Sequence, residues 1–99
     1  MVRRFGKPDA NQAAIIEALR GIPECAVLVL SAVGNGCPDI AVGYRGFNFL
    51  FEIKSPDRSP KENPGPELRQ QSFRDGWFGQ VQRVTTLKEI ITAMTGWNP

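Results

Sequence analysis

The sequence predicts an α/β domain in which helices cover both faces of a small mixed sheet, with elements in the order α-β-β-β-α-β-α. Three observations support this prediction. Residues 47–54 largely alternate apolar with polar side chains, which is typical of a strand. Residues 9–22 and 86–94 place apolar side chains three or four positions apart, which is typical of amphipathic helices. The 99 residues, 41% hydrophobic and 22% charged, are enough for one such domain, at positions 1–99.

The first helix is expected to begin near Asp9, an N-cap residue that can form a capping box with Gln12, and to stop at Gly21 and Pro23. The next apolar run, residues 25–31, is short and partly β-branched, which predicts a buried strand. No apolar run is long enough to span a membrane, and the basic start of the chain is not followed by the apolar stretch that a signal peptide requires. We therefore expect a soluble, cytoplasmic protein.

Two further strands, residues 38–44 and 47–54, are predicted to form a hairpin across Arg45-Gly46, where Gly46 supplies the positive φ of a tight turn. The remaining elements are a proline-rich loop over residues 55–66, a helix over 67–77, a short strand over 81–84 and a last helix that a capping box opens at 86–89.

The hairpin register brings two acidic residues together. If the loop has two residues, Asp39 lies directly opposite Glu52, with Cβ atoms about 5 Å apart, and Lys54 projects from the same face. A one-residue bulge would instead send Asp39 to the other face. The alternative interpretation is that Asp39 is a turn residue and that Glu52 and Lys54 lie on an exposed strand face.

The composition narrows the chemistry that these residues can perform. The chain has no histidine, which excludes Ser-His-Asp and Cys-His catalytic sites and imidazole metal sites. Two cysteines, Cys25 and Cys37, cannot fill a structural zinc site and are expected to be reduced. Opposed carboxylates repel each other, and a magnesium or manganese ion held by both would relieve that repulsion. The lysine beside them could assist a water molecule or stabilise charge on a phosphate.

Gln70 is the next candidate. It shares a helix face with Phe73 and Trp77, whose rings are expected to pack on the sheet, so Gln70 either bonds the main chain or borders the site. Gln12 likewise has two interpretations, as a capping residue or as an additional site residue. Glu17 is expected on a solvated helix face.

These motifs follow one another in the sequence: Gly36-Cys37-Pro38-Asp39, twelve residues, Glu52-Ile53-Lys54, and Gln70 ahead of Phe73 and Trp77. The ordered set resembles the PD-(D/E)xK nuclease superfamily, and within it the small stand-alone VRR-Nuc domain typical of phages and prophages. The likeness extends over most of the chain, from residues 9–12 to Val81 and Val84.

The resemblance implies a restriction-endonuclease-like αβββαβ core. Asp39 and Glu52 would be metal ligands together with the main-chain carbonyl of Ile53, Lys54 would be the catalytic lysine, and Gln70 would complete the site. Many relatives place a glutamate in the first helix, where this chain has Gln12. Stand-alone members are similar to Holliday-junction resolvases and act as homodimers on branched DNA, which places this protein in a bacterial host or prophage-bearing cell.

The resulting hypothesis is a magnesium- or manganese-dependent DNA endonuclease. The net charge of +2 tolerates a polyanionic partner without requiring one. Phosphate contacts are expected from basic residues in the loop and the following helix, namely Arg58, Lys61, Arg69 and Arg74. The alternatives are a nucleic-acid-binding module that does not cut, and a phage interaction protein with no nucleic-acid role.

Overall fold

The computed structural model describes residues 10–55 and 65–96. Their helices and strands are, in order, α1 (Ala10–Arg20), β1 (Cys25–Val29), β2 (Ile40–Tyr44), β3 (Phe47–Ile53), α2 (Gly65–Gly76), β4 (Val81–Val84) and α3 (Leu87–Thr95). The strands form one sheet in the order β1-β2-β3-β4, in which β1, β2 and β3 are antiparallel and β4 runs parallel to β3. The predicted α/β class and element order are confirmed.

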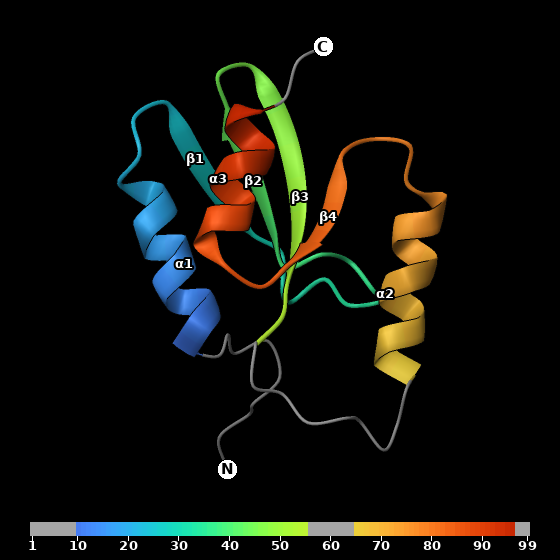
Figure 1. Cartoon of the computed structure of the whole chain (residues 1–99). Coiled ribbons are helices and arrows are strands. Elements are labelled where there is room, and N and C mark those ends of the chain that lie inside the picture. Colours follow the sequence, from blue (N-terminus) through green and yellow to red (C-terminus); the bar gives the residue numbers. More distant parts are fainter. Residues whose placement is uncertain (1–9, 56–64, 97–99) are drawn as a thin grey trace.

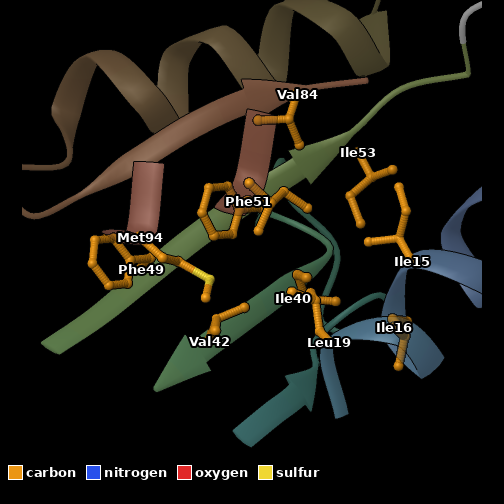
Figure 2. Close-up of a cluster of buried hydrophobic side chains, with 11 residues drawn as sticks. Ile15, Ile16, Leu19, Ile40, Val42, Phe49, Phe51, Ile53, Val84 and Met94 are labelled. Carbon is orange, nitrogen blue, oxygen red and sulfur yellow. The ribbon is translucent and has the colours of Figure 1, made fainter. Parts of the chain in front are cut away.

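One face of the sheet carries the hydrophobic core. In Figure 1, α1 lies beside β1 and α3 crosses in front of the central strands, whereas α2 stands beyond β4. Figure 2 shows side chains from α1 and α3 meeting those of the central strands. The buried core residues are Ile15, Ile16, Leu19, Ile40, Val42, Phe49, Phe51, Ile53, Val84, Ile90 and Met94. None of these comes from α2, so burial of apolar surface in this core does not explain how α2 is held.

The β2–β3 hairpin has the predicted two-residue turn and the predicted register. Arg45 has a φ of 53° and Gly46 a φ of 92°, and two positive φ values in succession are typical of a type I′ turn. Gly46 therefore has the positive φ that was predicted, and Arg45 has one as well. Cross-strand pairs run from Tyr44 opposite Phe47 to Ile40 opposite Phe51. No bulge interrupts these pairs.

The ends of two helices are held by side-chain hydrogen bonds. Thr86 and Glu89 form the predicted capping box at the start of α3. In the first turn of α1, the Asn11 amide donates to the main-chain oxygens of Lys54 (3.3 Å) and Thr85 (3.2 Å), which ties this helix to the ends of β3 and β4. The proposed N-cap Asp9 lies outside the described residues.

The prediction of a buried first strand was wrong. Leu28 in β1 is 63% exposed, because β1 is an edge strand in which Cys25 and Val27 pack against the core while Leu28 points away from it. Cys25 and Cys37 are both free thiols, as expected. Within residues 10–55 and 65–96, no helix has the length and apolar character that a membrane crossing requires.

Candidate active site

Asp39 immediately precedes β2 and is anchored to the strands on both sides. Its main-chain N–H donates to the Phe51 oxygen (3.0 Å), and its main-chain oxygen accepts from Leu30 (2.7 Å). Its carboxylate oxygen Oδ2 accepts a hydrogen bond from the main-chain N–H of Ile53 (2.7 Å). The cross-strand pairs of β2 and β3 end at Ile40 opposite Phe51, so Asp39 is not itself a register partner of Glu52, and the hydrogen bond from Ile53 instead holds the Asp39 carboxylate near Glu52.

Glu52 is almost completely buried, with 2% of its surface exposed. Burial and then the neighbouring Asp39 carboxylate raise the pKa of Glu52 to about 7, although Lys54 and Arg74 act in the opposite direction. Glu52 therefore does not belong to an exposed strand face. The Asp39 and Glu52 carboxylates therefore repel each other as expected, and the positive charges of Lys54 and Arg74 offset only part of the increase in the pKa of Glu52.

Lys54 lies on the same side of the sheet as Glu52 and reaches α2. Its Nζ atom is 2.5 Å from Gln70 Oε1 and 3.3 Å from Glu52 Oε2. The Lys54 side chain is 14% exposed, so most of its surface contacts other protein atoms and not solvent. The structure thus brings together Asp39, Glu52, Lys54 and Gln70, the four residues that the sequence singled out.

Glu67 also belongs to this cluster, although its sequence position was not predicted to lie at the site. Its Oε1 atom is 3.6 Å from Lys54 Nζ, and its Oε2 atom is 3.4 Å from Arg83 Nη2 on β4. A signal was available, because Glu67 precedes Gln70 by one helical turn and so shares its face of α2. Arg83 could be found only from the parallel register that sets it beside Glu52.

A glycine turn sets the position of α2 against the strands. Gly36 has a φ of +82°, and a Cβ atom there would lie only 2.2 Å from the main-chain oxygen of Arg69. No side chain could fit between this turn and the helix.

A small cavity of about 180 Å³ remains beside the turn, lined in part by Cys37, Asp39 and Gln70. The pKa of the Cys37 thiol is raised, first by burial and then by Glu52 and Asp39.

The aromatic residues of α2 differ from the expectation. Trp77 lies just beyond the end of α2 and is 45% exposed, and its ring stacks on that of Phe73 at a centroid distance of 5.1 Å. The prediction that both rings pack on the sheet was therefore wrong for Trp77. The reason is that α2 ends at Gly76, so the helical face that carries Gln70 and Phe73 does not continue to Trp77.

The remaining residues that the sequence singled out differ in how exposed they are. Gln12 is buried in the first turn of α1, next to Asn11, which donates a hydrogen bond to the Lys54 oxygen. Glu17 is exposed, as expected. Arg69 is exposed on α2. Arg74 is only half-exposed, and its Nη1 atom is buried without a hydrogen-bond partner among the described residues. Arg58 and Lys61 lie outside the described residues.

The donor set at Asp39 and Glu52 fits a hard divalent cation. In the described part of the chain, no group of three or more His, Cys, Asp or Glu side chains is placed to hold a metal ion. Magnesium, however, is commonly held by one or two carboxylates and keeps several water molecules. Two carboxylates in mutual repulsion, with a main-chain carbonyl and water to complete the shell, are adequate ligands for magnesium or manganese.

No family model matches the chain, and neither the curated proteins nor the solved structures include a match to it.

Proposed function

We propose that this protein is a magnesium- or manganese-dependent endonuclease that hydrolyses phosphodiester bonds of DNA, preferentially branched DNA such as a Holliday junction. One observation carries the proposal. The buried Glu52 carboxylate, with its pKa raised to about 7, lies beside Asp39 and within 3.3 Å of Lys54 Nζ. A carboxylate buried beside a second carboxylate is unfavourable in a purely structural role even with Lys54 close by, and it suits a site that is completed by a cation and a phosphate.

Each residue has a role in this chemistry. Asp39 and Glu52, with the Ile53 carbonyl as a further ligand, would hold a divalent ion, which would supply polarisation of the phosphate and a more acidic water. Lys54 would stabilise the negative charge that develops on the phosphate oxygens. Gln70 contacts the Lys54 ammonium at 2.5 Å and would hold it beside the metal site.

DNA binding would use basic residues on the α2 side of the site. Arg69 is exposed and suited to contact the phosphate backbone, while Arg74 is near enough to lower the pKa of Glu52 and suited to a phosphate at the site itself. A domain of 10.9 kDa is small compared with a four-way junction, and a two-fold homodimer would present two sites to it. We place the protein in the cytoplasm of a bacterial host or prophage-bearing cell.

The test is cleavage of a panel of branched, single-stranded and duplex DNAs with manganese. The wild-type protein is expected to cut, with branched DNA preferred, and Asp39→Ala and Lys54→Ala are expected to lose cleavage. Glu17→Ala is the matched control, because Glu17 is an exposed acidic residue of α1. Cleavage that Asp39→Ala leaves unchanged would overturn the assignment, and binding of branched DNA without cleavage would instead support a module that does not cut.

A further inference from the structure

The Lys54 ammonium lies among three side-chain oxygens of β3 and α2. Nζ is 2.5 Å from Gln70 Oε1, 3.3 Å from Glu52 Oε2 and 3.6 Å from Glu67 Oε1. The Gln70 oxygen accepts a hydrogen bond from Nζ, and the two carboxylate oxygens form ion pairs with it. The group is a cation seated in a set of oxygen ligands that comes from two separate elements.

The same oxygens would suit a divalent cation. Two carboxylates and an amide carbonyl are the hard oxygen ligands that magnesium and manganese prefer. Glu52 is shared, because it adjoins Asp39 on one side and Lys54 on the other. Glu52 therefore lies between two cation positions, one next to Asp39 and one bounded by Gln70 and Glu67. The chain itself fills the second position with Nζ.

We propose that the Lys54 ammonium occupies the place of a second metal ion, so that each chain binds a single divalent ion, between Asp39 and Glu52. This inference rests on the proposed function and specifies its metal requirement. It also assigns a role to Glu67, which positions Lys54 from α2 and is itself held by Arg83 at 3.4 Å. A second divalent ion would need the oxygens that Nζ contacts, and its charge would repel the ammonium at short range.

The experiment counts bound manganese in the absence of DNA, by equilibrium titration followed with electron paramagnetic resonance. We expect one ion per wild-type chain. Lys54→Met removes the cation and leaves its three oxygens in place, so this variant is expected to bind a second ion. Adding Glu67→Gln to Lys54→Met removes one carboxylate, which should return the count to one. Lys88→Met, at an exposed lysine of α3, is the matched control and should stay at one.

Two ions in the wild type, or no increase in Lys54→Met, would overturn the proposal. An extra ion that survives Glu67→Gln would overturn it as well, because the ion would then be held elsewhere. The wild-type spectrum provides a second measurement that needs no variant to fold, since an isolated ion and a coupled pair give different spectra. A protein that binds one ion and cuts no DNA would overturn the proposed nuclease function and leave the single-ion site supported.

Discussion

The Ile53 main-chain N–H donates to Asp39 Oδ2 over 2.7 Å, and this bond joins the residue before β2 to the residue between Glu52 and Lys54. The carboxylate of Asp39 is therefore oriented by the neighbouring strand and not only by its own backbone. Because the bond uses a single carboxylate oxygen, its structural contribution can be separated by mutation from the negative charge that a metal ion would require.

Asp39→Asn tests this separation. The asparagine Oδ1 atom can accept from Ile53 N–H as the carboxylate does, so the free energy of unfolding should remain within about 1 kcal/mol of wild type. Loss of the charge should lower manganese affinity and cleavage by about 100-fold or more. Urea unfolding, manganese titration and cleavage of a labelled junction measure the three quantities.

Asp39→Ala is the comparison, because it removes both the charge and the acceptor and should lose about 2 kcal/mol of stability in addition to activity. Wild-type cleavage by Asp39→Asn would show that the charge of Asp39 is not required.

The raised pKa of Glu52 predicts a stability that falls as the pH increases. Below the ordinary pKa of 4.5 the residue is protonated in both states. Between 4.5 and about 7 the unfolded chain loses its proton first, which lowers the free energy of unfolding, and above about 7 the loss is complete. This decrease in the free energy of unfolding is of the order of 3 kcal/mol.

Glu52→Gln cannot ionise, so relative to wild type it should be more stable at about pH 8 and gain nothing near pH 4.5. Urea unfolding in EDTA at the two pH values measures the difference. Parallel stability curves for the two proteins would show that Glu52 does not titrate as its buried position requires.

Manganese binding should release protons below about pH 7, because the ion needs the ionised form of Glu52 and the apo protein holds this proton up to that pH. Calorimetric titrations at about pH 6 in buffers of different ionisation enthalpy measure the number of protons released. Glu52→Gln is the control. Binding with no proton release at this pH would argue that the ion avoids Glu52.

Gly36→Ala tests the contact between the glycine turn and α2. The added Cβ would lie 2.2 Å from the Arg69 oxygen, in a backbone with a φ of +82°, so α2 must shift. We expect a loss of about 3 kcal/mol and a marked loss of cleavage, because Gln70 and Glu67 move with the helix.

Gly34→Ala is the matched control for this variant. Its φ is +81°, and nothing lies within 4 Å of the Cβ position. It should lose only about 1 kcal/mol and retain cleavage. Equal effects of the two substitutions on unfolding and cleavage would show that the approach of α2 is unimportant.

Arg69 and Arg74 should have different effects on DNA. Arg69→Gln removes an exposed charge, so it should weaken binding to all DNA shapes and reduce the slope of log affinity against log salt by about 1. Arg74→Gln should mainly lower the cleavage rate, since Arg74 is half-buried and acts on Glu52. Fluorescence anisotropy over a salt series and single-turnover cleavage distinguish the two effects. Equal salt slopes and equal rates for both variants would contradict the assignment.

Local patterns in the sequence were sufficient for most of the fold. The two-residue Arg45-Gly46 turn determined the hairpin register, and side-chain alternation along β3 then put Glu52 and Lys54 on one face. The capping box at Thr86 and Glu89 likewise involves only residues within one helical turn. These features were predictable because their physical causes act between residues close in the chain.

Only the tertiary structure decided what surrounds Lys54. Glu67 and Arg83 reach the site through the packing of α2 and the parallel pairing of β3 with β4, which no local pattern encodes. The exposure of Leu28 and Trp77 was also decided at this level, because it depends on which strand is at the edge and on where α2 ends. The sequence alone determined the hairpin that carries Asp39 and Glu52, since a two-residue turn sets strand register locally. The ion pairs around them arise from contacts between distant segments, which form only when the whole domain packs.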